Sequence, residues 1–400
     1  MELLISAAQV LTGPGGACID DGAVLVSGSA IAAVGTRKEV EEVAPAGVQR
    51  ASFPQGTILP GLIDCHVHLA FDASPDPVGA LREADDLSLL LGMAGRAQQL
   101  LAVGVTTARD LGDRGGLSVR LRDAIAAGVL HGPRILAATA PLTPPGGHCW
   151  FLGGEVAGQE AIRNQVRRNA ETGADVIKVM ATGGGLTRGG AATWQSQFTT
   201  KELRLVVEEA HRTGLPVAAH AHGTAGIASA VAAGVNTVEH CTWMVEGGFE
   251  MRGDVVADLI AKEIHVCPAA SPNWRRFVER FGRERAEELF GQVRWMAEQG
   301  VRLVAGTDAG VPGAMFDGFV NGLELYEHLG FPQDRILDMA TVEAARALGI
   351  DADTGQLVAG YRADLLVVDG DPLRDLNALR ALRLVLAGGR LYSNGTDAGW

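Results

Sequence analysis

This chain of 400 residues lacks any long uninterrupted run of apolar residues, although 47% of its residues are hydrophobic. No stretch reaches the roughly 18 apolar residues that a membrane-spanning helix needs. The N-terminus also lacks the basic start and apolar core of a signal peptide. We therefore expect a globular, cytoplasmic protein with no membrane partner, whose apolar residues fill a large core.

Cysteine is scarce as well. The five cysteines are odd in number, lie far apart and form no CxxC pair. This pattern argues against a disulfide framework and favours reduced thiols. Cys65 and Cys241 each adjoin a histidine, and we interpret both as small residues that pack behind a strand end rather than as metal ligands.

Basic clusters and nucleotide-binding motifs are absent too. The net charge is −13, and lysine and arginine are scattered along the chain, which is unlike the basic surface of a nucleic-acid-binding protein. The glycine runs at 146–147 and 183–185 belong to no P-loop and to no dinucleotide-binding motif. We therefore expect a small-molecule partner and no nucleic acid.

What the chain does contain is a repeated alternation of short β-rich runs and amphipathic segments between residues 57 and 310. Apolar strands that alternate with helices are typical of a parallel sheet, and eight such units fit a closed barrel. The sequence therefore predicts an α/β fold with a (β/α)8 TIM barrel. The predicted strands are 57–68, 105–111, 134–140, 175–182, 216–222, 236–241, 265–271 and 302–308. The main predicted helices are 87–103, 159–172, 200–213, 224–233, 283–300, 317–329 and 332–348.

The two ends of the chain differ from this middle part. Residues 1–55 and 355–393 hold short strand-like runs broken by glycine-rich turns. Neither end is long enough for a stable sheet of its own, so we expect them to join into one small composite β-sandwich domain. The predicted domains are 1–56 together with 351–400 for the β-sandwich, and 57–350 for the barrel. The predicted terminal strands are 3–11, 23–26, 30–34, 356–357, 363–369 and 382–392.

Two histidines close the first predicted barrel strand. His66 and His68 lie one residue apart in the segment GLIDCHVHL. In an extended backbone, residues i and i+2 point to the same face, so both imidazoles can bind one metal ion while Val67 packs the other way. On its own, this pair is equally compatible with two histidines on a surface or in a core.

Further polar residues stand on the other predicted strands. Lys178 lies on the fourth strand, His220 ends the fifth, His240 ends the sixth and Asp308 ends the eighth. The C-terminal ends of the strands form the active face of a TIM barrel. Imidazoles and carboxylates at that face are suitable ligands for a divalent ion such as Zn²⁺, although Mn²⁺, Co²⁺ and Fe²⁺ also accept them. They are hard to explain as packing, because burial of polar groups is costly.

Lys178 discriminates between kinds of metal site. An ammonium group beside bound cations is strongly disfavoured, so this lysine must be neutral, turned away, or converted by CO₂ to a carbamate. A carbamate is an anionic ligand that can bridge two ions. The alternative is a lysine whose stem packs in the barrel and whose head pairs with an acid such as Asp308. The residues alone leave both interpretations open.

These motifs resemble the metal-dependent amidohydrolase superfamily. The resemblance rests on the segments GLIDCHVHL, DVIKVMATGGG, VAAHAHG, TVEHCTWM and AGTDAG, and it covers nearly the whole chain. Within the superfamily the chain looks like the imidazolonepropionase-related and Xaa-Pro dipeptidase-like branch. Imidazolonepropionases have a similar but mononuclear site without this lysine, so Lys178 indicates the dipeptidase-like, binuclear group. That group cleaves amide bonds, often next to a free carboxylate.

The resemblance implies a role for each ligand. His66, His68 and Asp308 would hold the more buried of two divalent ions, most simply Zn²⁺. His220 and His240 would hold the more exposed ion, and a CO₂-derived carbamate on the lysine would bridge the two. A hydroxide shared by the ions would then attack the scissile carbonyl. Asp308 would take the proton of that hydroxide and pass it to the leaving nitrogen.

Other residues are candidates for substrate contact. His222 lies on the same strand face as the fifth-strand histidine and is a candidate ligand in its place. His148 lies in the loop PPGGHCWF, where the family has a comparable histidine. Arg188, in the glycine-rich loop after the fourth strand, can form a bidentate contact to a carboxylate. Trp243 and Trp274 each follow a strand and can wall an apolar pocket. For His222, His148 and Arg188, a position without a substrate role is the alternative.

The leading functional hypothesis is a binuclear metal-dependent hydrolase that cleaves an amide bond of a dipeptide or an N-acyl amino acid. A second is hydrolysis of an aryl amide, carbamate, lactone or cyclic amide by the same site, because substrate loops and not the fold decide the reaction. A third is a metal-binding barrel without catalysis, which has little use for Asp308 beside an open coordination position. Relatives of this kind are commonly oligomers, so we expect a homo-oligomer.

Overall fold

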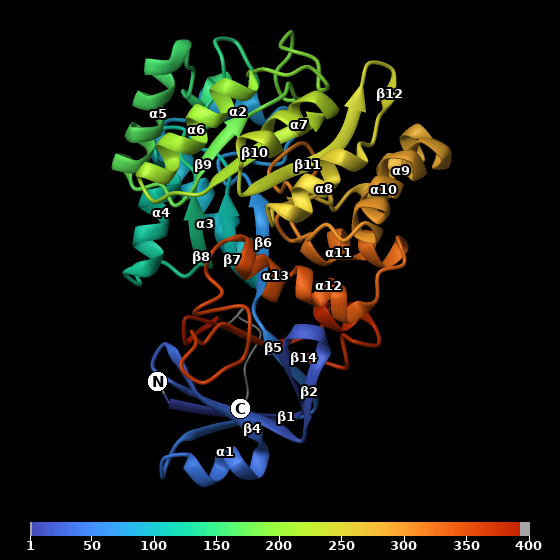
Figure 1. Cartoon of the computed structure of the whole chain (residues 1–400). Coiled ribbons are helices and arrows are strands. Elements are labelled where there is room, and N and C mark those ends of the chain that lie inside the picture. Colours follow the sequence, from blue (N-terminus) through green and yellow to red (C-terminus); the bar gives the residue numbers. More distant parts are fainter. Residues whose placement is uncertain (1, 393–400) are drawn as a thin grey trace.

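The computed structural model describes residues 2–392 and consists of a barrel with a smaller β-domain below it (Figure 1). Parallel strands line the barrel in two hydrogen-bonded groups, β6-β7-β8 and β9-β10-β11-β13. The short β12 extends β11 as a hairpin. The bounds are β6 (Leu62–Val67), β7 (Val105–Asp110), β8 (Arg134–Ala137), β9 (Ile177–Met180), β10 (Val217–Gly223), β11 (Thr237–Val245), β12 (Gly248–Phe249) and β13 (His265–Cys267).

Irregular segments close the barrel between the two groups. Leu142 joins β8 to β9, because its N–H donates to the carbonyl of Lys178 at 2.8 Å and its carbonyl accepts from the N–H of Met180 at 2.9 Å. The segment after β13 joins back to β6, where the N–H of Asp308 donates to the carbonyl of His66 at 2.8 Å. The barrel is therefore continuous around its axis.

The eighth strand differs from the prediction of a regular strand at 302–308. In the structure this segment makes only isolated bridges, from Leu303 to Val266 and from Ala309 to Val67. The physical reason is that the N–H groups of Ala305 and Thr307 donate to the Met339 carbonyl and to the Asp64 side chain instead of to a neighbouring strand, and that Asp308 has a left-handed φ of 58°. The segment nevertheless occupies the position of the eighth strand and presents Asp308 at the same end of the barrel as the other candidates.

Helices surround the barrel strands (Figure 1). The predicted helices at 87–103, 159–172, 200–213, 224–233 and 283–300 all form, with ends within a few residues of the prediction. Thr199 caps α6 through a capping box with Glu202. The bounds are α2 (Pro77–Glu83), α3 (Asp86–Ala102), α4 (Leu117–Ala126), α5 (Gly158–Thr172), α6 (Thr200–Arg212), α7 (Thr224–Ala233), α8 (Gly253–Ala261), α9 (Trp274–Phe281), α10 (Arg283–Glu298), α11 (Phe319–His328), α12 (Gln333–Met339) and α13 (Val342–Ala347), with the 3-10 turn η2 (Trp150–Leu152).

Both ends of the chain build one eight-stranded sheet in the order β16-β15-β14-β5-β1-β3-β4, with β2 on β1. The N-terminal strand β5 pairs with β1 on one side and with the C-terminal β14 on the other. β5 continues beyond residue 56 to Pro60 before β6 begins in the barrel. The bounds are β1 (Glu2–Gly13), η1 (Pro14–Gly16), β2 (Ala17–Asp20), β3 (Gly22–Ser27), β4 (Ala30–Thr36), α1 (Arg37–Val43), β5 (Gln49–Pro60), β14 (Leu365–Asp369), η3 (Leu376–Arg380), β15 (Leu382–Ala387) and β16 (Arg390–Tyr392).

Three terminal predictions are corrected by the structure. The predicted helix 332–348 is split into α12 and α13, because Thr341 has non-helical backbone angles between them. The predicted strand 382–392 is a hairpin, since Gly388 and Gly389 turn the chain with positive φ values of 56° and 71°. The predicted strand 356–357 lies in a loop, where the N–H of Leu357 donates to the carbonyl of Thr12.

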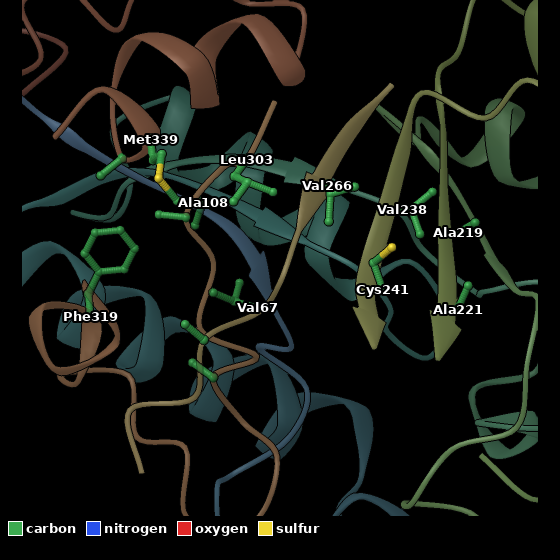
Figure 2. Packing of buried hydrophobic residues seen from close by; sticks show 14 of the residues in the cluster. Val67, Ala108, Ala219, Ala221, Val238, Cys241, Val266, Leu303, Phe319 and Met339 are labelled. Atoms are coloured by element: carbon green, nitrogen blue, oxygen red, sulfur yellow. The ribbon is translucent and has the colours of Figure 1, made fainter. Parts of the chain in front are cut away.

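The main apolar core lies between the barrel strands and the helices, and Figure 2 shows part of it. Val67 is fully buried in this cluster, as expected if its neighbours His66 and His68 face the other way. Cys241 packs in the same cluster, close to Val238 (Figure 2). Val67 and Cys241, which adjoin candidate ligands in the sequence, thus anchor their strands in the apolar core.

Among residues 2–392 we find no helix with both the length and the apolar character required to cross a membrane.

Candidate metal centre

The polar side chains predicted from the strand ends converge at one end of the barrel. They are His66 and His68 at the end of β6, Lys178 on β9, His220 on β10, His240 on β11 and Asp308 in the closing segment. All but Asp308, whose side chain is 20% exposed, are buried. A cavity of about 350 Å³ is lined by all of them except His66.

His66, His68 and Asp308 form one group of candidate ligand atoms. The Nε2 atoms of the two imidazoles lie 3.3 Å apart. The Oδ1 atom of Asp308 lies 3.4 Å from Nε2 of His66 and 3.3 Å from Nε2 of His68. Because the three atoms all lie within 4.8 Å of one another, they can hold one ion of the size of Zn²⁺ after small adjustments of the side chains.

A second group of candidate ligands consists of His220, His222 and His240, whose ring nitrogens also lie within 4.8 Å of one another. The rings of His220 and His240 are 4.7 Å apart, and the ring of His222 stacks on that of His240 at 4.4 Å. Nδ1 of His222 is hydrogen-bonded to the Thr242 hydroxyl at 2.9 Å, which leaves Nε2 for other contacts. The structure therefore brings His222 into the same cluster as the two predicted ligands.

Four imidazoles in these groups, those of His66, His220, His222 and His240, are held in the neutral form. Burial lowers the pKa of His66 and of His222 to about 4, and it lowers the pKa of His220 and His240 well below the ordinary value. Neutral imidazole is the form that ligates metals, because the metal takes the lone pair that a proton would occupy. Four neutral imidazoles beside one carboxylate are a donor set suited to a divalent cation.

Asp308 keeps its negative charge in this setting. Burial acts to raise the pKa of its carboxyl, but the hydrogen bond with His68 holds that pKa below its usual range. The backbone behind it is fixed by Asp64, which accepts hydrogen bonds from the Thr307 hydroxyl at 2.6 Å and from the Thr307 N–H at 3.1 Å. The left-handed conformation of Asp308 is thus supported by its neighbour.

Lys178 is the most unusual group in the cavity. Its side chain is 1% exposed, and within the described residues its Nζ has no hydrogen-bond partner. Burial lowers the pKa of this amine to about 8. The pairing with Asp308 that the sequence left open is therefore not formed. A buried amine without an acceptor is costly. This position therefore fits a lysine whose nitrogen carries a group such as a metal-bound carbamate.

The chain matches a known protein family over most of its length. The family model described as "Amidohydrolase family" matches residues 57–391. The chain belongs to this family. A curated relative, the ochratoxinase of Aspergillus niger, is 28% identical over 427 aligned residues, which cover 94% of this chain and 84% of the relative. An imidazolonepropionase of Bradyrhizobium sp. is 26% identical over 89% of each chain.

A solved structure agrees with this membership. The crystal structure of a Xaa-Pro dipeptidase with bound methionine matches with a TM-score of 0.86 and 27% identity, over 98% of this chain and 100% of that chain. The predicted resemblance and fold class are thereby confirmed. This amidohydrolase is a metal-dependent hydrolase that acts on carbon–nitrogen bonds of a small-molecule substrate.

Sequence reasoning missed one group that supports the site of this amidohydrolase. Glu239 is fully buried beneath the ligands, where its Oε2 lies 2.9 Å from Nδ1 of His66. Its Oε1 accepts from the Arg109 guanidinium at 2.7 Å and from the Thr237 hydroxyl at 2.5 Å. Burial acts to raise the pKa of Glu239, but the charge of Arg109 and the hydrogen bond with His66 hold that pKa below its usual range. The bond to Nδ1 turns Nε2 of His66 toward the other ligands.

We expect Glu239→Gln to weaken metal binding by about 10- to 100-fold, because the amide is a poorer acceptor for His66 and leaves Arg109 without its buried counter-charge. Competition with a chromophoric chelator measures the affinity directly. Glu209→Gln is the matched control, since Glu209 is 2% exposed and pairs with Arg167 and Arg212 on the outside of the barrel. Unchanged affinity in Glu239→Gln would show that the carboxylate does not orient His66.

The predicted substrate contacts occupy different places in this amidohydrolase. His148 lines the cavity, and its ring centre lies 4.6 Å from that of His220. Burial lowers the pKa of His148 to about 3. Arg188 is exposed and lines an adjoining cavity of about 330 Å³, which shares Gly185, Leu186 and Pro312 with the metal-site cavity.

Trp243 is the exception, and its prediction as a substrate contact needs correction. Its side chain is fully buried and packs edge-on against Trp295, with Nε1 3.4 Å from Sδ of Met296. Positive φ values at His240, Cys241 and Trp243 change the direction of the side chains along this part of β11. The indole therefore faces α10 and does not line the cavity. Trp274, by contrast, lines an apolar cavity next to His222 and His240.

Proposed function

We propose that this chain is a binuclear metal-dependent amidohydrolase that cleaves an amide bond of a dipeptide or an N-acyl amino acid. The supporting observation is the placement of two groups of candidate ligands around one cavity that also contains the unpartnered amine of Lys178. Two separate groups can hold two ions, and a carbamate on Lys178 would supply the bridging charge. The solved structure of a Xaa-Pro dipeptidase with the same fold is consistent with this assignment.

The chain's own residues supply the remaining chemistry. Bound divalent ions provide Lewis acidity, which makes water more acidic and polarises a carbonyl oxygen. Asp308, held ionised beside His66 and His68, takes a proton from the attacking water and delivers it to the leaving nitrogen. His148 is positioned to donate a hydrogen bond to the substrate, because its backbone N–H is fixed by Gln197 and its Nδ1 lies 3.3 Å from the Thr187 hydroxyl.

Arg188 supports a substrate with a free carboxylate. The cavity that Arg188 lines is also lined by Arg82, so two guanidinium groups face it, whereas Asp76 contributes one carboxylate. Asp76 already accepts a hydrogen bond from the N–H of Gly79 at the start of α2. This cavity opens beside the metal site, so the carboxylate of a leaving amino acid can reach an arginine there through a charge-assisted hydrogen bond.

A substrate panel tests the proposed function. We expect the Zn²⁺-loaded protein to hydrolyse Xaa-Pro dipeptides or N-acyl amino acids, and to lose this activity when a chelator removes the metal. Metal analysis of the active protein should give two ions per chain. Arg188→Ala should raise KM for a substrate with a free carboxylate by about 10-fold and leave its methyl ester unaffected. Turnover of lactones, carbamates or cyclic amides alone would contradict the proposal.

A further inference from the structure

A cavity of about 610 Å³ lies where the barrel meets the composite sheet, away from the metal centre. On the barrel side it is lined by Arg134, the first residue of β8, and on the sheet side by Arg390, the first residue of β16. The metal centre lies at the C-terminal ends of the barrel strands, whereas the composite sheet lies below the barrel (Figure 1). Among the described residues this cavity and the metal-site cavity share none, so it is separate from the hydrolytic site.

Positive charge is concentrated in this cavity. Within residues 2–392 it is lined by four guanidinium groups and two carboxylates, those of Arg122, Arg134, Arg362, Arg390, Asp175 and Asp353. The whole chain has the opposite balance, with 34 basic and 47 acidic residues. A local excess of positive charge on an acidic protein attracts anions to that place.

Three of these arginines are each held through a single nitrogen. Nη1 of Arg134 donates to both carboxylate oxygens of Asp353, at 2.9 and 3.2 Å. Nε of Arg362 donates to Asp364 at 2.9 Å. Nη1 of Arg390 donates to a carbonyl near the C-terminal end of α4 at 3.3 Å. The other nitrogens of these three groups have no acceptor in the described part of the chain, so their N–H groups are available to a ligand.

The three guanidinium groups belong to segments that touch one another. The carboxylate of Asp353 pairs with Arg134, while its backbone carbonyl accepts from the N–H of Arg362 at 2.8 Å. A Cβ atom at Gly388, two residues before Arg390, would lie 2.5 Å from Nη2 of Arg362. Glycine at this position therefore leaves the space that the guanidinium group occupies. The contacts bring all three arginines to one side of the cavity.

Apolar side chains line the cavity on the barrel side, among them Leu101, Ile125, Leu130 and Ile135. An inorganic ion would leave this apolar surface and most of the volume unused. The lining therefore suits a ligand with a charged group and an apolar body. A phosphate group has three acceptor oxygens and up to about two negative charges. It matches three guanidinium groups better than a carboxylate does, since a carboxylate has two oxygens and one charge.

We propose that this cavity binds an organic phosphate ester. The phosphate group is held by Arg134, Arg362 and Arg390, and the organic group lies against the apolar side chains of the barrel. The ligand contacts the barrel and the C-terminal strands together, so it stabilises the folded chain and raises its unfolding temperature. This binding is independent of amide hydrolysis and does not rest on the proposed function.

Matched probes test the class of ligand. Naphthyl phosphate carries both halves of the proposed ligand, naphthol and inorganic phosphate carry one half each, and naphthoate replaces the phosphate by a carboxylate. In calorimetric titrations of the full chain, we expect the Kd of naphthyl phosphate to be at least about 10-fold lower than that of each other probe. Equally tight binding of naphthol, of naphthoate or of inorganic phosphate would overturn the assignment to an organic phosphate.

Arg390→Gln is the main variant, because no carboxylate within the described residues pairs with Arg390 and its removal leaves none without a partner. We expect this variant to bind naphthyl phosphate about 10-fold more weakly, and Arg390→Lys to lose less, since lysine keeps the charge but not the planar fork. Arg383→Gln is the matched control. Arg383 lies on the neighbouring strand β15, pairs with Asp369 and does not line the cavity.

Arg188→Gln reports on binding at the other end of the barrel, because Arg188 lines the cavity that adjoins the metal site. We expect the Kd of naphthyl phosphate to be unchanged in this variant. Weaker binding by Arg188→Gln together with unchanged binding by Arg390→Gln would place the ligand beside the metal centre and overturn the proposal.

Unfolding temperatures separate recognition by Arg390 from a purely structural role. Naphthyl phosphate should raise the Tm of the wild-type protein, and at the same concentration it should raise the Tm of Arg390→Gln less. If Arg390 only fixes the end of α4, Arg390→Gln will have a lower Tm without ligand but an unchanged Kd for naphthyl phosphate. That result, or no binding of naphthyl phosphate to the wild-type protein, would overturn the proposal.

Discussion

Asp308→Asn is expected to lower kcat for amide hydrolysis by about 10²- to 10⁴-fold, the contribution that a positioned general base makes to proton transfer. The amide keeps the size and the hydrogen-bonding oxygen of the side chain, but it cannot hold the transferred proton. In this protein the carboxylate is surrounded by imidazoles that favour its ionised form, so no other described carboxylate at the cavity is placed to take over its role.

Metal content is the essential companion measurement for this variant. The Oδ1 atom of Asp308 is itself a candidate metal ligand. A loss of turnover therefore reports on proton transfer only if the Asp308→Asn protein still binds its metal ions. Asp258→Asn, on the exposed face of α8, controls for a change in net charge. Near-normal turnover by fully metallated Asp308→Asn would remove Asp308 from the proposed proton transfer.

Lys178→Met should reduce the metal content from two ions to one at most and lower kcat/KM by more than about 10²-fold. The physical reason is that methionine fills a similar volume but provides no anionic bridge between two cations. Removal of the buried, unpartnered amine should at the same time stabilise the metal-free protein by about 1–3 kcal/mol, because its desolvation cost disappears. Thermal or urea unfolding of the metal-free protein measures this gain.

This variant is decisive because its metal content and activity should fall while the stability of the metal-free protein rises. If Lys178 were only a packing residue, methionine would leave two ions bound and activity intact. Lys262→Met serves as the control, because the Lys262 amine is partly exposed and donates to the carbonyl of Val231 and to Asp258. A Lys178→Met protein that binds two ions with wild-type affinity would contradict the binuclear site.

The candidate ligands were predictable from the sequence because each lies on, or at the end of, a predicted apolar strand, and the parallel strands of a barrel bring such residues together at one face. The pattern is local, so it can be read without a structure. Lys178 follows the same pattern. The lack of a contact between its amine and Asp308 could not be predicted, because the sequence does not show which neighbouring group a flexible side chain contacts. The structure removes that alternative.

The contact between Glu239 and His66 joins residues 173 positions apart, and no local pattern indicates it. Glu239 comes directly before His240 on β11, and the side chains of successive residues in a strand normally point to opposite faces. The side chain of Glu239 would therefore be expected to point away from that of His240. Trp243 was misplaced for a related reason. Strand periodicity fails where the backbone of β11 has positive φ values, and such values at non-glycine residues are set by tertiary contacts.

The composite sheet has a consequence for synthesis of the protein on the ribosome. β5 is paired on one edge with β1, but its other edge waits for β14, which begins only at Leu365. Every barrel segment up to Ala309 is therefore translated before that edge is covered. An open strand edge is a site for unwanted pairing between chains. Chains that terminate early, before Leu365, should accordingly aggregate even though they contain all the candidate metal ligands.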